Sequence, residues 1–210
     1  MDKRPKQLLL VTGTGTEVGK TWVGAHLLEA LRGHGLSVAA RKPAQSFGPG
    51  EGPTDAEVLA AATGEQVETV CPKHRCYEVP MAPPMAADFL GRPPIAIADL
   101  AGEIEFPDGV DVGLVETAGG VRSPLAHDGD TVDLIGLLKP DAVVLVADAG
   151  LGTLNAVLLS YAALAPLPVH VILNRFDVQD TLHVANCRWL TERFGLSVVT
   201  AVDELARAVA

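Results

Sequence analysis

Aromatic residues are scarce in this chain of 210 residues, where Phe, Trp and Tyr together make up 4%. Large aromatic rings therefore cannot fill the interior. The hydrophobic share of 48% must supply the core mainly through Val, Leu, Ile and Ala, the usual content of a parallel sheet buried on both faces. Charged residues reach only 20%, which excludes extensive disorder. This length and composition suit one domain over residues 1–210.

Positive charge is also in short supply, with 16 Lys and Arg against 26 Asp and Glu and a net charge of -10. So acidic a protein has no general attraction for nucleic acid or for anionic membranes. No apolar run reaches the roughly 18 residues that span a bilayer, and the run at 8–11 is too short for a signal peptide. We therefore expect a cytoplasmic protein with neither nucleic acid nor membrane as a partner.

Cysteine is limited to Cys71, Cys76 and Cys187, an odd number with no C-x-x-C pair. Two of them flank His74 closely enough to resemble a metal knuckle, but the segment lacks the fourth ligand that zinc requires. Reduced thiols in a cytosolic protein are the expected state.

Short apolar runs alternate with segments of helical periodicity along the chain. Such alternation predicts an α/β fold, a mostly parallel sheet with helices on both faces. Thr54 is expected to cap the second helix, and the proline-rich stretch 70–94 gives little signal beyond helices at 84–90 and 95–104. The expected strands are 8–11, 37–40, 112–115, 142–147, 169–173 and 197–202, and the other expected helices are 20–32, 55–62, 132–138, 154–164, 182–194 and 203–210.

Polar residues stand at or just after the ends of five apolar runs. Ligands of parallel α/β sheets bind beyond the carboxyl ends of the strands. These side chains should therefore converge on one edge of the sheet: Thr12, Lys42, Glu116, Asp148 and Asn174.

A glycine-rich loop follows the first strand and opens the first helix, the context that a phosphate-binding P-loop requires. Lys20 would reach the β- and γ-phosphates of ATP, and the Thr21 hydroxyl would bind Mg²⁺. The pattern departs from G-x-x-x-x-G-K-T at its first glycine, which is Thr14, flanked by glycines. The expected nucleotide-binding residues are Gly13, Thr14, Gly15, Thr16, Glu17, Val18, Gly19, Lys20 and Thr21. A single-domain P-loop NTPase-like fold that uses ATP and Mg²⁺ is predicted.

Four further segments, together with this loop, resemble the dethiobiotin synthetase family. They are Lys-Pro-Ala-Gln-Ser at 42–46, Thr-Asp-Ala at 54–56, Glu-Thr-Ala-Gly-Gly at 116–120 and Gly-Leu-Gly-Thr-Leu-Asn at 150–155. The resemblance runs over residues 8–174. It implies an ATP-dependent carboxylating cyclo-ligase of biotin biosynthesis that converts 7,8-diaminopelargonate and CO2 to dethiobiotin, through a carbamate and a carbamic-phosphoric anhydride.

The resemblance also implies roles for individual residues. Mg²⁺ would be held by Thr21, Asp55 and Glu116, three oxygen ligands from three elements. Lys20 and Lys42 would neutralise the carbamate and the transferring phosphoryl group. The remaining catalytic positions would be Thr16, Glu17 and Ser46.

Further substrate contacts implied by the resemblance are Lys42, Ser46, Thr117, Gly119 and the helix start Gly152, Thr153, Leu154 and Asn155. That helix start would bind the substrate carboxylate of the partner subunit, in a homodimer with active sites at the interface. Asn174 would contact the adenine edge.

Each role has a plainer alternative. Lys42 could be a solvated lysine at a strand end, Asp55 a charge that favours a helix dipole, and Glu116 a structural acid. Ser46 could be ordinary loop polarity, the segment 152–155 an ordinary capped helix, and Asn174 a turn asparagine.

Two departures from the family leave questions open. Thr117 stands where glycine is usual, and the C-terminus lacks a Gly-x-Ile-Pro turn, so nucleotide preference and the particular diamine stay undecided. The alternatives are a related P-loop ligase that acts on another amine or carboxylate, and a ParA-like nucleotide switch. Gly15 occupies the position of the signature lysine of ParA proteins, which counts against the switch.

Overall fold

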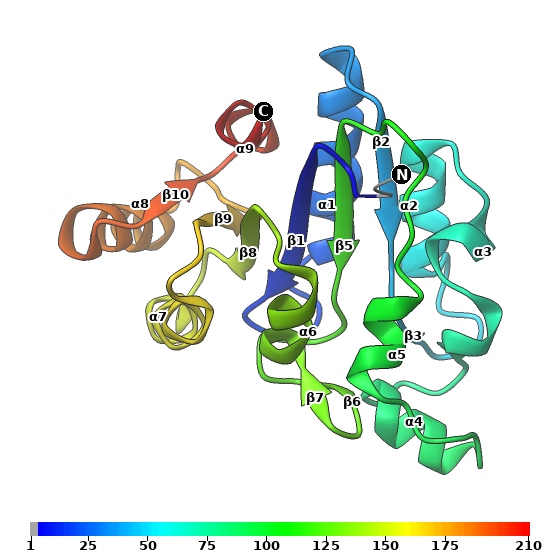
Figure 1. Ribbon diagram of the computed structural model, residues 1–210. Coiled ribbons are helices and arrows are strands. Elements are labelled where there is room, and N and C mark those ends of the chain that lie inside the picture. Colours follow the sequence, from blue (N-terminus) through cyan, green and yellow to red (C-terminus); the bar gives the residue numbers. More distant parts are fainter. Residues whose placement is uncertain (1–3) are drawn as a thin grey trace.

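A six-stranded sheet forms the centre of the computed structural model, which describes residues 4–210 (Figure 1). Its strand order is β10-β9-β8-β1-β5-β2, and every neighbouring pair is parallel. The mostly parallel α/β architecture predicted from the sequence is confirmed. The strands are β1 (Gln7–Gly13), β2 (Val38–Arg41), β5 (Val112–Glu116), β8 (Ala142–Asp148), β9 (Val169–Asn174) and β10 (Ser197–Val199).

Helices cover both faces of this sheet. One face carries α1 (Lys20–Gly33), α2 (Asp55–Thr63), the short α3 (Val67–Val70) and α9 (Val202–Val209). The other face carries α4 (Pro83–Phe89), α5 (Ile97–Gly102), α6 (Thr131–Leu138) and α7 (Thr153–Leu164). Leu190, from the turn that follows α8 (Thr181–Arg188), packs on that second face.

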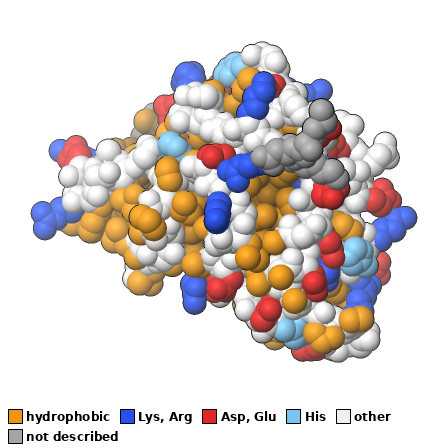
Figure 2. Space-filling view, in the orientation of Figure 1, with side chains coloured by type: hydrophobic (Ala, Val, Ile, Leu, Met, Phe, Trp, Pro, Cys, Tyr) orange, Lys and Arg blue, Asp and Glu red, His pale blue; other side chains and the backbone are white. Residues whose placement is uncertain are grey.

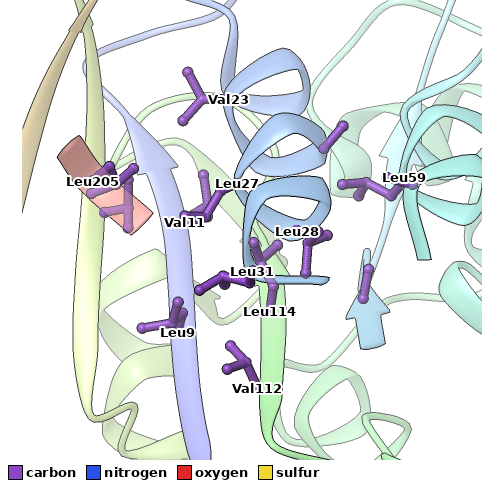
Figure 3. Packing of buried hydrophobic residues seen from close by; sticks show 14 of the residues in the cluster. Leu9, Val11, Val23, Leu27, Leu28, Leu31, Leu59, Val112, Leu114 and Leu205 are labelled. Carbon is purple, nitrogen blue, oxygen red and sulfur yellow. The ribbon is translucent and has the colours of Figure 1, made fainter. Parts of the chain in front are cut away.

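Alternation along β1 explains how one strand serves two cores. Leu9 and Val11 face α1, while Leu8 and Leu10 face the opposite layer, and all four are buried. Figure 3 shows Leu27 and Leu31 of α1 beside Leu9 and Val11 of β1. Each buried leucine stabilises the fold by roughly 1.5–3 kcal/mol relative to an exposed one. Packing of this kind fixes α1, and with it the phosphate loop at its start.

Very short elements account for most of what the sequence did not predict. β3 (Gln45–Ser46) pairs with β4 (Cys76–Tyr77), and β6 (Pro124–Ala126) pairs with β7 (Gly129–Asp130). A 3₁₀ turn, η1 (Lys73–Arg75), precedes β4. Pairs of two or three residues are too short to show periodicity.

Two expected elements near the C-terminus differ from the structure, the strand in its length and the helix in its hydrogen-bond pattern. The strand expected at 197–202 ends at Val199, because Val202 already begins α9. The helix expected at 182–194 is α8 followed by the π-helical turn η2 (Trp189–Arg193). Local propensity does not register such a change of hydrogen-bond pattern.

Thr54 caps α2 as the sequence predicted. Its hydroxyl accepts a hydrogen bond from the Glu57 amide, and the Glu57 carboxylate accepts one from the Thr54 amide at 2.6 Å, a reciprocal capping box. The cap sets Asp55 as the first residue of the helix, so its position does not depend on the loop before it.

Among residues 4–210, no helix combines the length and the apolar character that crossing a bilayer demands. In the space-filling view, hydrophobic side chains gather near α7 and at the end that holds α4 (Figure 2). Leu151 and Leu159 near α7, and Met85 and Phe89 of α4, are the large exposed side chains of these regions.

Candidate active site

The phosphate loop lies between β1 and α1 and is held from the neighbouring part of the sheet. Lys20 is buried and its Nζ donates to the Gly15 carbonyl at 2.8 Å. Asn174, at the end of β9, donates through Nδ2 to the Val18 carbonyl at 3.0 Å. Arg175 donates to the Glu17 carbonyl at 2.5 Å. The loop is therefore anchored before any ligand binds.

Only glycine fits at position 19, because of its backbone conformation and because of the side chain packed against it. Its φ is +92°, in the left-handed region that favours glycine. A Cβ at this position would lie 2.1 Å from Nδ2 of Asn174. The Asn174 contact and the glycine of the motif thus depend on each other. No side chain caps α1, so backbone N–H groups at its start are available to an anion.

Two carboxylates, an ammonium group and a hydroxyl meet beside this loop. Lys42 Nζ lies 2.6 Å from Asp55 Oδ2 and 2.6 Å from Glu116 Oε1. Thr21 Oγ1 lies 2.8 Å from Asp55 Oδ1 and 2.8 Å from Glu116 Oε1, so its one hydrogen is shared between two acceptors. The structure therefore brings Lys42 together with the three residues expected to hold Mg²⁺.

Burial and charge set the protonation of this cluster. Burial alone would lower the pKa of Lys42, but the carboxylates of Glu116 and Asp55 outweigh it and raise that pKa. Burial raises the pKa of Glu116, whereas the Lys42 ammonium more than offsets burial at Asp55 and lowers its pKa. Burial, with the charge of Lys42, lowers the pKa of Lys20 to about 8. Lys42 and Asp55 thus favour each other's charged form, whereas burial works against the charged forms of Glu116 and Lys20.

The oxygen atoms of the cluster fit a magnesium ion. Oε2 of Glu116 is buried and has no hydrogen-bond partner, an arrangement that leaves a lone pair for a cation. Across residues 4–210 no three His, Cys, Asp or Glu side chains gather as a metal cage. A cation here would take the Thr21 hydroxyl, the Asp55 and Glu116 carboxylates, and ligand or water oxygens. Mg²⁺ commonly binds nucleotides in this way.

A cavity of about 820 Å³ opens over this cluster. Nine of the residues expected in the site line it: Thr16, Glu17, Gly19, Lys20, Thr21, Lys42, Ser46, Asp55 and Gly119. Ser46 Oγ donates to the Met81 carbonyl at 2.5 Å, which ties β3 to the proline-rich stretch.

Sequence reasoning missed several residues of the cavity wall: Gln45, Phe47, Glu51, Met81, Ser123 and Arg175. Arg175 had the clearest signal, since it directly follows Asn174 at a strand end. Its φ of +56° turns the chain toward the phosphate loop.

Thr117 lies beneath the loop and is fully buried. Its Oγ1 is 3.1 Å from the hydroxyl of Thr12, and its amide donates to the Val11 carbonyl at 3.0 Å. Thr117 does not line the cavity, whereas Gly119 does. A side chain at position 117 therefore adds a contact beneath the loop and takes no space from a ligand.

A second cavity of about 460 Å³ adjoins Gly19 on the side of β9 and α9. Trp22, Asn174 and Phe176 supply its aromatic and amide surface, and Thr200, Ala201 and Val202 close it. The Asn174 side chain thus reaches both this cavity and the phosphate loop. The space is next to the loop and combines aromatic and aliphatic surface with the polar side chains of Asn174, Arg175 and Thr200.

The start of α7 stands apart from both cavities. Gly152, Thr153, Leu154 and Asn155 line neither of them. Gly152 caps the helix with a φ of +93°, and Oγ1 of the buried Thr153 has no hydrogen-bond partner. Asn155 is exposed. This chain alone does not bring the predicted carboxylate site to its own phosphate loop.

Comparison with known proteins places these features in a family. Residues 7–210 match a family model described as an AAA domain. An ATP-dependent dethiobiotin synthetase BioD of Rhodococcus jostii is 45% identical over 160 residues, 75% of this chain and 68% of that protein. The protein of the same name from Anaeromyxobacter dehalogenans strain 2CP-C is 37% identical, over 95% of this chain and 92% of its own.

Solved structures share the fold at low sequence identity. A Borrelia burgdorferi B31 protein assigned to plasmid partition and bound to AMPPNP has a TM-score of 0.57 and 13% identity, with 96% of this chain and 90% of that chain covered. The signal recognition particle receptor FtsY of Elizabethkingia anophelis has a TM-score of 0.54 and 16% identity, with 99% and 62% covered. These two structures align with 96% and 99% of this chain, so nearly all of it shares their fold.

Proposed function

Since this chain belongs to the dethiobiotin synthetase family, we propose that it converts 7,8-diaminopelargonate, CO2 and ATP to dethiobiotin, ADP and phosphate in biotin biosynthesis. It is an ATP-dependent ligase. The observation that carries the proposal is the Lys42 ammonium buried between Asp55 and Glu116 beside the phosphate loop.

ATP would bind with its phosphates in the loop 13–21 and its base in the smaller cavity. Lys20 and the free N–H groups of α1 face the first of these sites. Trp22, Asn174 and Phe176 surround the second. One hydrogen of the Asn174 side-chain amide is bonded to the Val18 carbonyl. The other hydrogen and the amide oxygen are therefore free to contact a base.

Magnesium would be held by Thr21, Asp55 and Glu116, where Glu116 Oε2 offers an uncommitted lone pair. When bound, the ion would neutralise negative charge on the β- and γ-phosphates.

The proposed reaction has three steps. One amine of the substrate adds to CO2 and forms a carbamate. A carbamate oxygen then attacks the γ-phosphorus and ADP leaves, which gives a carbamic-phosphoric anhydride. The second amine finally attacks the carbonyl carbon, closes the cyclic urea and expels phosphate.

The residues of the chain would act mainly through position and charge. Phosphoryl transfer needs alignment and positive charge more than covalent help from the protein. Lys42 and Lys20 supply two ammonium groups on one side of the cavity. Thr16, Glu17, Ser46 and Gly119 line the remaining wall, against which the carbamate would lie. Thr117 would support the loop from beneath through its contact with Thr12.

We also propose a homodimer in which α7 serves the partner's site. The start of α7 lies outside the cavities of its own chain, although Asn155 and the helix N–H groups suit a carboxylate. Leu151 is 92% exposed and Leu159 67% exposed on the same segment, apolar surface that a second copy would cover.

Oxygen labelling tests the proposed anhydride. If a carbamate oxygen attacks the γ-phosphorus, the bridging oxygen leaves with phosphate, so C¹⁸O2 should give one ¹⁸O atom in each phosphate released. Mass spectrometry of phosphate and dethiobiotin from a short reaction measures this. Unlabelled phosphate together with labelled dethiobiotin would rule out the anhydride and leave the ligase assignment intact.

A further inference from the structure

Two cysteines lie close together behind the active site. The Sγ atoms of Cys71 and Cys76 are 3.6 Å apart, and both residues carry free thiols. Cys71 follows α3 and is buried, whereas Cys76 begins β4 and is partly exposed. The turn η1 between them folds the chain back, with the Arg75 amide donating to the Pro72 carbonyl at 2.8 Å. The turn thus holds both sulfur atoms in contact.

The surroundings of Cys76 favour its thiolate. Gln45 Nε2 donates to Cys76 Sγ at 3.2 Å, and Arg92 donates to the Cys76 carbonyl at 2.7 Å. The hydrogen bond with Cys71 lowers the pKa of the Cys76 thiol, against its burial, and Gln45 and the charges of Arg92 and His74 lower it further. The same hydrogen bond, with burial, raises the pKa of Cys71. One sulfur is therefore a nucleophile and the other a protonated neighbour.

Cys76 is partly exposed, and a cavity lies beside this corner of the molecule. A cavity of about 880 Å³ is lined by His74, Arg75 and Tyr77, the chain neighbours of Cys76, and by Arg92. Arg92 also lies over the Tyr77 ring, with its guanidinium carbon 5.0 Å from the ring centroid. This cavity shares no lining residue with the one over the phosphate loop, and Cys76 itself lines neither.

We propose that Cys76 is a peroxide-reactive thiol and that Cys71 resolves it to an intramolecular disulfide. The Cys76 thiolate attacks one oxygen of hydrogen peroxide, which breaks the O–O bond and gives a sulfenic acid and hydroxide. That hydroxide takes the proton of Cys71 and becomes water, and the Cys71 thiolate then attacks the sulfenic sulfur and displaces hydroxide, which is protonated to the second water. The two thiols lose two electrons and two protons, and the peroxide becomes two molecules of water.

This disulfide would disturb residues that position the catalytic cluster. The sulfur atoms must close from 3.6 Å to about 2.05 Å, which moves the segments that carry them. The Val70 carbonyl, next to Cys71, accepts a hydrogen bond from the Lys42 amide at 2.7 Å. Oxidation therefore pulls on the segment that positions Lys42.

A second connection runs through Gln45. Its Oε1 accepts from the Ala56 amide at 3.0 Å, in the first turn of α2 beside Asp55, while its Nε2 donates to Cys76. A disulfide draws the Cys76 sulfur toward Cys71 and weakens the bond to Gln45. Turnover should therefore fall, while the phosphate loop, which these contacts do not touch, still binds ATP.

Peptide mapping tests the disulfide independently of the proposed reaction. Trypsin cuts after Lys73 and Arg75, so Cys71 and Cys76 fall on separate peptides that only a disulfide joins. Hydrogen peroxide should produce that joined pair, with the loss of two hydrogen atoms per chain, and dithiothreitol should reverse it. The Cys71→Ser variant should instead accumulate a sulfenic acid on Cys76 that dimedone traps. Absence of the joined peptides, or dimedone labelling on Cys187 alone, would overturn the proposal.

Cys187 provides the matched control within the chain. It lies on α8, away from the pair, and burial raises the pKa of its thiol. Cys187→Ser should still form the disulfide, and Cys76→Ser should not. Peroxide should lower turnover of the Cys187→Ser enzyme by about tenfold or more and leave Cys76→Ser unaffected. Full turnover in an enzyme shown by mass to be oxidised would overturn the link to the active site.

Discussion

Lys42 Nζ lies 2.6 Å from Glu116 Oε1, and the two side chains are only 1% and 0% exposed. A buried pair of this kind contributes little beyond what two apolar residues would, but losing one partner leaves a charge stranded in the interior. Lys42 also lines the cavity over the phosphate loop, whereas Glu116 lies behind it. The effects of Lys42 and Glu116 on stability and on catalysis therefore have to be measured separately.

A double-mutant cycle measures how strongly Lys42 and Glu116 are coupled in the folded protein. Lys42→Met strands the Glu116 charge and should reduce the free energy of unfolding by about 3–5 kcal/mol. Lys42→Met with Glu116→Gln should recover much of that loss, because the fully buried charge is gone and the Asp55 side chain, 43% exposed, can be solvated. Denaturant titration at pH 7 measures the two single variants and the double variant, with Lys73→Met on the exposed surface as control. Simple addition of the two single effects would show that the pair is not coupled.

Removing the Lys42 ammonium should impair catalysis without impairing nucleotide binding. Lys42→Ala should lower turnover by about 10²–10³-fold, because the charge of the carbamate and phosphoryl group loses a buried ammonium. ATP should still bind, since Lys20 and the loop amides remain. Stopped-time dethiobiotin assays and calorimetric ATP titration on the same preparation distinguish the two. Wild-type turnover would remove Lys42 from the mechanism.

Trp22 gives a direct optical probe of the proposed base cavity. Trp189 is the other tryptophan and lies on η2, so Trp189→Phe leaves a single reporter beside Gly19. Its emission should change on addition of ATP and stay constant with inorganic tripolyphosphate. Trp22→Leu should weaken ATP binding by up to about tenfold, the value of one aromatic contact. An unchanged ATP affinity in Trp22→Leu would place the base elsewhere.

Substitution of Asn155 tests whether the start of α7 binds the substrate carboxylate. Asn155→Ala should raise the KM for 7,8-diaminopelargonate and leave kcat nearly unchanged, because a contact to the substrate carboxylate supplies mainly ground-state binding. The KM for ATP serves as the internal control. Sedimentation of the same variant establishes whether the dimer persists. An unaltered KM for the diamine would move the carboxylate site away from α7.

The contacts of the Asp111 carboxylate predict that the stability of the folded protein depends on pH. Its carboxylate accepts hydrogen bonds from Lys6 Nζ at 2.7 Å and from the Ser37 hydroxyl and amide, and these hold its pKa well below the usual value. The unfolded chain takes up this proton near pH 4 whereas the folded chain resists it. The stability that Asp111 contributes is therefore complete above that pH and is lost as the pH falls below it.

Asp111→Asn should accordingly lower the thermal midpoint at pH 7, and the gap from wild type should narrow as the pH falls below about 4. Circular dichroism melts across that range measure the gap, with the exposed Asp108→Asn as a neighbouring control. A gap that is independent of pH would show that the effect of the substitution is not electrostatic.

The centre of the site was predictable because parallel strands end at one edge. Lys42 and Glu116 follow apolar runs, and Asp55 follows the capping residue Thr54, so strand ends and a helix start bring them together. The phosphate loop was predictable for another reason, because its glycine-rich pattern ending in Gly-Lys-Thr stands between a strand and a helix.

Features that depend on contacts between distant segments were not predictable. Arg175 bonds the Glu17 carbonyl across 158 positions, and the two-residue strands β3 and β4 pair across the proline-rich stretch. Cys71 and Cys76 read as ordinary thiols, because spacing alone does not show that a turn brings their sulfurs to 3.6 Å. Thr117 gave no sign of pointing beneath the loop, toward Thr12.

Phosphate release from Mg-ATP and bicarbonate, with and without 7,8-diaminopelargonate, tests the account most directly. We expect release that depends on the diamine and matches, mole for mole, the dethiobiotin found by mass spectrometry. Release at the same rate without the diamine, with no dethiobiotin formed, would contradict the proposed reaction while leaving the P-loop fold in place.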